Sequence, residues 1–99
     1  MGPTAADQVL LDCCLRHEAG AWKAFVDRFL GLISHVVERT SQMVGMPLRA
    51  ADVEDVAAEV LLQVIKNDFA VLRRFRRQSS LATYLTVIAR RVCDAERAR

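Results

Sequence analysis

Apolar residues recur every three or four positions along almost the whole chain, which is the period of an amphipathic helix. No stretch alternates between apolar and polar residues in the way a half-buried strand does. The two prolines, Pro3 and Pro47, both fall between the periodic segments. The pattern predicts an all-α fold, a compact bundle of about four helices that forms one domain over residues 1–99.

The first two predicted helices are separated by a short break at residues 18–20. The first begins near Thr4 or Asp7, because either side chain can accept a hydrogen bond from a free backbone N–H group. Its apolar stripe is Val9, Leu10, Cys13, Cys14 and His17. The second runs from about residue 21 to residue 44, where Gly45 and Pro47 end it. Its broad inward face consists of Trp22, Phe25, Val26, Phe29, Leu30, Ile33, Val36, Val37 and Met43.

The third and fourth predicted helices are joined by a loop at residues 68–79. The third helix begins with Asp52 as its N-cap, and its buried stripe is Val53, Val56, Ala57, Val60, Leu61 and Val64. The fourth helix covers residues 80–99, with Ser79 or Ser80 as its cap. Its inward side chains are Leu81, Leu85, Ile88, Ala89 and Val92.

The outward arc of the third predicted helix is acidic with a leucine in its middle. It carries Asp52, Asp55, Glu59, Leu62, Gln63 and Lys66. Carboxylates in a first helical turn complement the helix dipole, and single exposed leucines are common, so the arc can be an ordinary solvent-facing surface. The functional alternative is a docking face for a basic partner.

Charge divides the chain into two parts of opposite sign. Residues 66–99 hold nine Lys and Arg against three Asp and Glu, whereas residues 1–65 hold five against nine. The basic part contains four arginines in one loop, namely Arg73, Arg74, Arg76 and Arg77. A basic loop with aromatic and hydroxyl side chains that leads into a helix suits a nucleic-acid surface, although a merely solvated basic face has the same composition.

Several classes of function are excluded by what the sequence lacks. It has no nucleophile–base pair, glycine-rich phosphate loop or histidine cluster, so we predict neither an enzyme nor a cofactor. The sequence has three cysteines, Cys13, Cys14 and Cys93. Because an odd number fits no disulfide framework, we predict that they are small buried side chains in a reducing compartment. Cys13 and His17 have metal-capable spacing, but without a second pair we predict no metal site. No segment has the length of a membrane span or the pattern of a signal peptide, so we expect a cytoplasmic protein.

Two segments together resemble one family, the bacterial sigma factors of the extracytoplasmic-function class. Residues 52–62 read Asp-Val-Glu-Asp-Val-Ala-Ala-Glu-Val-Leu-Leu and resemble the family stretch D-x-E-D-(apolar)-x-Q-E-(apolar)-(apolar). Residues 75–90 resemble its stretch F-x-x-x-S-[SF]-x-x-W-L-x-x-I-A-R. The aromatic start at residues 21–25 and the trailing Asp94-x-x-Arg97 also fit. The resemblance covers roughly residues 7–99, and the order and spacing of the two motifs are more specific than either alone.

The resemblance implies a sigma region-2 domain, which is a helical bundle that acts in transcription initiation. Its third helix would dock on the clamp coiled coil of the largest catalytic subunit of RNA polymerase. Asp55 and Glu59 match the acidic clamp-binding positions of the family. The polymerase-binding set that follows is Asp52, Asp55, Ala58, Glu59, Leu62 and Gln63. An anti-sigma factor is a further partner that the resemblance allows.

The resemblance also implies that the last loop and helix open promoter DNA at the −10 element and hold a flipped base of the non-template strand. The expected DNA-binding set is Arg73, Arg74, Phe75, Arg76, Arg77, Gln78, Ser79, Ser80, Thr83, Tyr84, Val87, Arg90, Arg91 and Arg97. Tyr84 matches the tryptophan at the start of the family's recognition helix. Phe75 has two equal interpretations, as a stacking surface for a base or as an anchor of the loop in the core.

The chain departs from the family pattern at several positions. Ala58 stands where the family has Gln, Tyr84 replaces Trp, and Arg91 stands where Asn is common. A full member would continue past Arg99 to a second domain that reads the −35 element, so we expect either a fragment or a short stand-alone version. Two other functions stay open: a protein-interaction module without specific DNA recognition, and a bundle that binds nucleic acid without polymerase.

Overall fold

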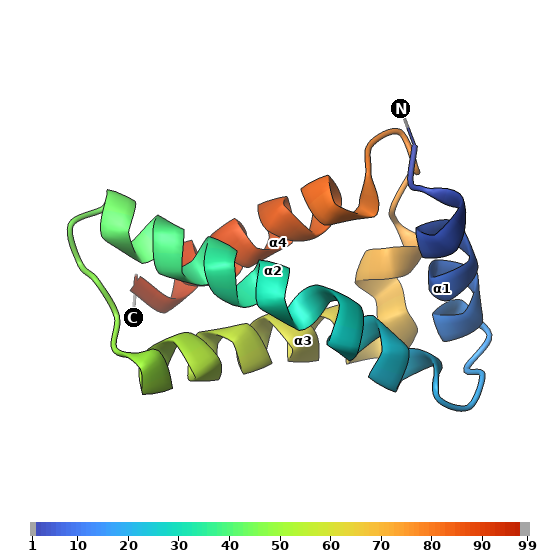
Figure 1. Cartoon of the computed structure of the whole chain (residues 1–99), viewed down its shortest axis with the longest axis horizontal. Helices are drawn as coiled ribbons and strands as arrows, with labels where there is room; N and C mark the ends of the chain where they lie inside the picture. Colours follow the sequence, from blue (N-terminus) through green and yellow to red (C-terminus); the bar gives the residue numbers. More distant parts are fainter. Residues whose placement is uncertain (1, 98–99) are drawn as a thin grey trace.

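The computed structural model describes residues 2–97 and the side chains of residues 2–96. This part of the chain forms the helices α1 (Ala5–Leu15), α2 (Ala21–Met43), α3 (Ala50–Arg73) and α4 (Leu81–Arg97). The expected all-α bundle of about four helices is therefore confirmed. In Figure 1, α2, α3 and α4 run lengthwise, and α1 lies across one end of the bundle, beside the last turn of α3. Within residues 2–97, no helix is long and apolar enough to cross a membrane.

Two of the predicted helix starts are confirmed by their capping hydrogen bonds. The Asp7 backbone N–H donates to Thr4 Oγ1 at 3.2 Å, and the Thr83 N–H donates to Ser80 Oγ at 3.0 Å. The predicted start of α3 is wrong by three residues, because the N-cap is Arg49 and not Asp52. The helix begins at Ala50, and Arg49 at the N-cap position makes no side-chain cap. Asp52 consequently lies in the first turn, where the helix dipole still favours a carboxylate.

The core lies along the inward faces of all the helices. The stripes predicted for α3 and α4 are buried or half-buried throughout. In α2, however, Leu30 and Met43 were expected inside and are 41% and 75% exposed. In α1, Val9 is also exposed, whereas Leu11 is fully buried. The buried residues of α1 are Asp7, Leu11 and Cys14. Because Asp7 is charged, a search for apolar residues alone does not find this face of the helix.

Asp7 is buried because it is paired. Its carboxylate lies 2.8 Å from Arg28 Nε of α2, and this hydrogen bond, together with the negative charge, raises the pKa of Arg28. Burying a carboxylate is costly unless a charged donor satisfies it. The pair therefore holds α1 on α2 in one orientation.

A backbone break interrupts α3 near its end. Asn67, Asp68 and Phe69 adopt left-handed conformations, with φ of 55°, 57° and 59°. The chain then forms one more helical turn, so the connection to α4 begins at Arg74 and not at Asp68 as predicted. Left-handed backbone costs roughly 1–2 kcal/mol per residue other than glycine. The buried Phe69 ring offsets this cost by packing 5.7 Å from Trp22, between ring centroids.

The prediction that the cysteines are buried is confirmed for two of the three. Cys14 and Cys93 are buried, while Cys13 is half-buried. Burial, and to a lesser extent the charge of Cys13, raises the pKa of the Cys14 thiol to about 11, so Cys14 stays protonated at neutral pH and packs as a small apolar group. His17 lies beyond the end of α1, with Nε2 2.6 Å from Asp68 Oδ1. Among the described residues, no three His, Cys, Asp or Glu side chains are grouped to hold a metal ion.

Candidate functional site

The acidic arc of α3 is exposed or half-buried in the structure. We call Asp52, Asp55, Ala58, Glu59, Leu62 and Gln63 the acidic ridge. Glu59 and Gln63 are half-buried, the other four are exposed, and Leu62 has 56% of its surface exposed. The Gln63 amide donates to Glu59 Oε1 at 3.1 Å, and no ridge carboxylate forms an ion pair with any of the described side chains. Within the described part of the chain, the carboxylates of the ridge are therefore not neutralised by a cation.

Two hollows flank the acidic ridge. The larger, of about 690 Å³, is lined by Thr40, Ser41, Met46, Pro47, Leu48, Asp52, Asp55, Val56, Cys93 and Glu96. The smaller, of about 310 Å³, lies between α3 and α4 and is lined by Glu59, Gln63, Val71, Ile88, Arg91, Val92, Ala95 and Glu96. The smaller hollow brings Glu59 of the ridge and Arg91 of the predicted DNA-binding set to one groove.

The four loop arginines, all of which belong to the expected DNA-binding set, are not equivalent in the structure. We call residues 73–80, which are the last residue of α3 and the connection to α4, the basic loop. Arg77 Nη2 lies 2.7 Å from Asp12 Oδ1, and Arg73 donates to the backbone oxygens of Leu15 and Asp68 at 3.0 and 2.8 Å. These two side chains are occupied within the protein.

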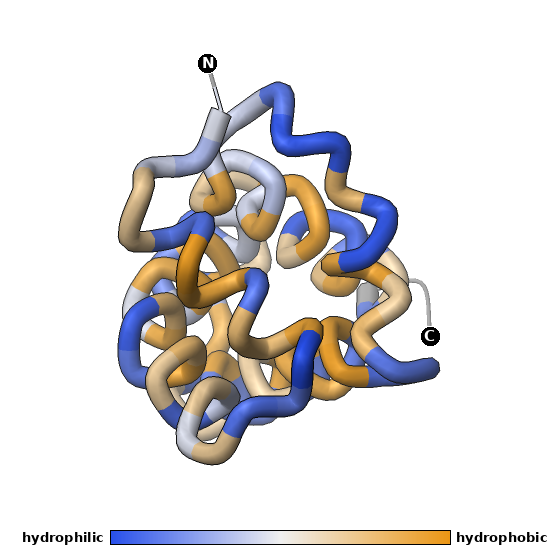
Figure 2. The backbone as a smooth tube through the Cα atoms, turned by 90° about the vertical axis from the view of Figure 1, so that its right-hand side faces the viewer, coloured by the Kyte–Doolittle hydropathy of each residue, from blue (hydrophilic) through white to orange (hydrophobic). Residues whose placement is uncertain are grey.

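Arg74 and Arg76 differ from that pair. Arg74 is exposed, and among the described residues its side chain donates to the Ala70 carbonyl alone, at 3.3 Å. Arg76 is exposed, and the described residues offer it no hydrogen-bond or ion-pair partner. These two are the loop cations available to an anionic ligand. Figure 2, a view from the end that carries α1, shows a hydrophilic stretch of backbone beside the N-terminal end of the chain.

The aromatic side chains at the junction pack against each other. Phe75 is 7% exposed and belongs to the core, and its ring stacks on Tyr84 with the centroids 4.5 Å apart. The Tyr84 hydroxyl donates to the Val71 carbonyl at 2.6 Å. Of the two interpretations of Phe75, the structure supports the anchor, and the ring is not an open stacking surface. One face of Tyr84 is covered by the same contact.

The polar residues of the junction remain accessible to different degrees. Gln78 and Thr83 are exposed, whereas Ser79 and Ser80 are half-buried. Ser79 Oγ donates to the Ser80 carbonyl at 3.1 Å, and Ser80 Oγ donates to Thr83 Oγ1 at 2.8 Å. Gln78 is therefore the junction side chain with the most freedom to contact a ligand.

The exposed face of α4 carries the remaining predicted DNA contacts. Val87, Arg90 and Arg91 are exposed. With a rise of about 1.5 Å per residue, Arg90 lies roughly 10 Å further along the helix than Thr83, which is the span of a few nucleotides. The side chain of Arg97 lies outside the described residues.

Contacts from the N-terminal part of the chain to the basic loop were missed by the sequence patterns. Asp12 meets Arg77 across 65 positions. A Cβ atom on Gly2 would lie 2.8 Å from the Arg77 carbonyl oxygen, so the N-terminal segment runs directly against the loop. No periodicity could have indicated these contacts, because they depend on how α1 crosses the end of the bundle.

Comparisons with protein-family models, with curated proteins and with solved structures found no match to this chain.

Proposed function

We propose that the chain is a transcription initiation module like sigma region 2, which acts in the cytoplasm. It docks α3 on the clamp coiled coil of RNA polymerase and uses the basic loop and α4 to recognise and melt the promoter −10 element. The observation that carries the proposal is the presence of two faces of opposite chemistry on one small bundle. The carboxylates of the acidic ridge form no ion pair with the side chains that the structure describes, and the loop and α4 expose Arg74, Arg76, Arg90 and Arg91.

The acidic ridge has the chemistry that a basic helical partner requires. Asp55 and Glu59 stand one helical turn apart, and the exposed Leu62 lies one turn beyond Glu59 on the same arc. Complementary charges speed and orient the encounter, while burial of a leucine side chain contributes roughly 1.5–3 kcal/mol. The ridge thus combines steering with one apolar anchor.

The basic loop and α4 have the chemistry that a single strand requires. Arg74 and Arg76 supply charge for phosphates, independent of sequence. Gln78 and Thr83 supply donors and acceptors that can meet the edges of an unstacked base. The module carries out no chemical step of its own, because the polymerase performs the synthesis.

The proposal is tested by selecting strands from a pool with a random window of about six nucleotides. We expect the domain, mixed with the clamp coiled coil, to enrich one sequence class, and to bind a scrambled strand several-fold more weakly. Gln78→Ala combined with Ser79→Ala reduces the ratio of the two affinities, for the enriched and for the scrambled strand. It leaves the salt dependence of the affinity unchanged, because neither residue contacts phosphates as a cation. The absence of any strand preference, both alone and with the coiled coil, contradicts the proposal.

One observation favours a second candidate, a protein-interaction module without specific DNA recognition. Half of the loop arginines are used internally, which lowers the charge available to a strand. Such a module binds the coiled coil but shows no salt-dependent affinity for single-stranded DNA.

A further inference from the structure

We propose that Asp12 of α1 is a positioning residue for the basic loop. Its ion pair keeps Arg77 from binding the DNA strand, and it fixes the direction in which the side chains of Arg76 and Gln78 point. The inference rests on the proposed function, because it assigns a role within the same DNA-contacting surface.

Three separate contacts join the first part of the chain to the loop. The Arg77–Asp12 ion pair spans 2.7 Å, Arg73 Nη2 donates to the Leu15 carbonyl at 3.0 Å, and Gly2 lies against the Arg77 carbonyl. Figure 1 shows the N-terminal end beside the segment that connects α3 to α4. The loop is thus held at the Arg73 side chain, at the Arg77 side chain and at the Arg77 backbone.

The backbone of Arg77 shows why such a hold is needed. Its φ is 61°, a left-handed conformation that is unfavourable for a residue other than glycine. A strained residue of this kind persists only when its surroundings determine its position. Here Asp12 holds the guanidinium group while Gly2 packs on the carbonyl. If the ion pair with Asp12 is broken, the backbone of Arg77 can adopt a less strained conformation. The side chain of the neighbouring Gln78 then points in another direction.

Asp12 is itself rigidly placed. Asp7, about one and a half turns earlier in α1, is buried and bound to Arg28 of α2. The side chains of Asp12 and Arg77 are 39% and 30% exposed, against 63% and 80% for the surface pair of Asp27 and Lys23. The better-shielded pair is less weakened by salt and by competing water. A continuous set of contacts therefore runs from α2 through α1 to the loop.

Removing the charge of Asp12 has two opposite effects on DNA binding. Asp12→Asn frees Arg77 to contact a phosphate, so the slope of log affinity against log salt becomes steeper by about 0.7. Relaxation of the loop at the same time reduces the preference for the selected strand over a scrambled one, several-fold. General destabilisation would instead weaken binding to both strands and would not steepen the salt dependence.

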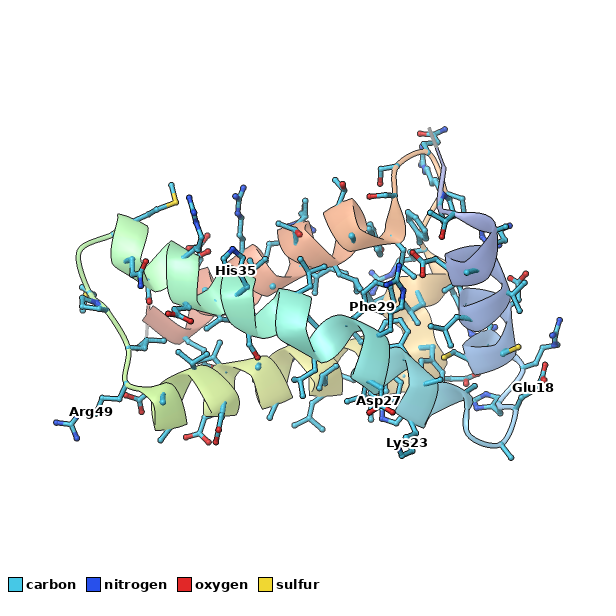
Figure 3. All side chains as sticks on the ribbon, viewed as in Figure 1. Glu18, Lys23, Asp27, Phe29, His35 and Arg49 are labelled. Carbon is cyan, nitrogen blue, oxygen red and sulfur yellow. The ribbon has the colours of Figure 1, made fainter. Side chains whose placement is uncertain are left out.

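The experiment measures both quantities for the full chain and three variants. Asp12→Glu keeps the carboxylate and should retain most of the strand preference. Asp27→Asn is the matched control, because it also removes one carboxylate and releases one cation, Lys23. That pair lies on the lower edge of the molecule in Figure 3, away from the loop. We expect the steeper salt dependence and the loss of preference for Asp12→Asn alone.

Amide hydrogen exchange of residues 76–79 gives a readout that needs no DNA. We expect faster exchange there in Asp12→Asn than in the wild type and Asp12→Glu, with the core amides of α2 unchanged. A wild type that binds no strand selectively contradicts the proposed function, and exchange then decides the positioning role alone. Unchanged exchange at residues 76–79 overturns the inference, as does a salt dependence that changes equally in Asp12→Asn and Asp27→Asn.

Discussion

The acidic ridge and the basic loop look alike as charge clusters in the sequence but differ in the structure. On the ridge, Asp52, Asp55 and Glu59 form no ion pair with the described side chains. In the loop, Arg73 and Arg77 are bound to other parts of the chain, and only Arg74 and Arg76 are available. A count of charged residues in the sequence therefore gives the number of available charges on the ridge correctly. For the loop it overstates the number of available arginines about twofold.

The difference has a physical cause. A helix satisfies most of its own backbone groups, so the outward side chains of α3 are not needed to bind backbone groups elsewhere in the fold. A loop has no such internal ladder and must be ordered by side chains, and arginine donors suit the free carbonyls and carboxylates at the end of the bundle. Loop cations are for this reason the first to be used internally.

The largest expected effect contrasts the apolar residues of the two regions. Phe75→Ala should lower the free energy of unfolding by about 3–5 kcal/mol, because the ring is buried and stacked on Tyr84. Leu62→Ala should change it by less than about 0.5 kcal/mol, since the side chain is mostly exposed. Urea unfolding measures both. A stable Phe75→Ala variant contradicts the assignment of this residue as an anchor.

The second prediction sharpens the role of the acidic ridge. Asp55→Lys with Glu59→Lys should weaken binding to the clamp coiled coil about 100-fold, and Glu59→Lys alone about tenfold, because like charges would then face each other. Glu38→Lys with Glu54→Lys is the matched control, with the same change in net charge on exposed positions off the ridge. Fluorescence anisotropy with the labelled coiled coil measures the affinities. Equal losses in both double variants would mean that net charge alone matters.

The third prediction divides the loop arginines into two pairs. Arg74→Ala with Arg76→Ala should reduce the slope of log affinity for a single strand against log salt by about 1.4. The affinity lost between about 50 and 200 mM salt is then about sevenfold smaller than in the wild type. Arg73→Ala with Arg77→Ala should leave the slope nearly unchanged and lower the free energy of unfolding by roughly 1–2 kcal/mol. The same slope for both pairs would remove the distinction drawn between them.

The smallest expected effect concerns the junction of the loop with α4. Tyr84→Phe removes the hydroxyl that donates to the Val71 carbonyl at 2.6 Å. We expect a loss of about 1 kcal/mol in the free energy of unfolding, because the ring contact with Phe75 is retained. Thermal unfolding followed by circular dichroism measures it. No change in stability would indicate that water replaces the bond at no cost.

The helices, the inward stripes of α3 and α4 and the acidic ridge could be predicted because each follows from a repeat of three or four residues. In α1 and α2 the repeat also placed Val9, Leu30 and Met43 inside, and these are exposed.

The break at Asn67 and Asp68 could not be predicted, because neither glycine nor proline marks it. Contacts with distant residues hold it, namely His17 with Asp68 and Trp22 with Phe69. The pairing of Asp12 with Arg77 joins residues 65 positions apart and depends on how α1 crosses the bundle. Local patterns contain no such information.

The most direct test of the account asks whether one chain binds the coiled coil and a single strand at the same time, through separate faces. A labelled selected strand is titrated into the domain, with and without saturating clamp coiled coil. We predict a ternary complex with strand affinity undiminished by the coiled coil. Reversal of Asp55 and Glu59 should abolish only coiled-coil binding, and removal of Arg74 and Arg76 should weaken only strand binding. Competition between the two ligands, or loss of strand binding in a folded ridge variant, would contradict the account.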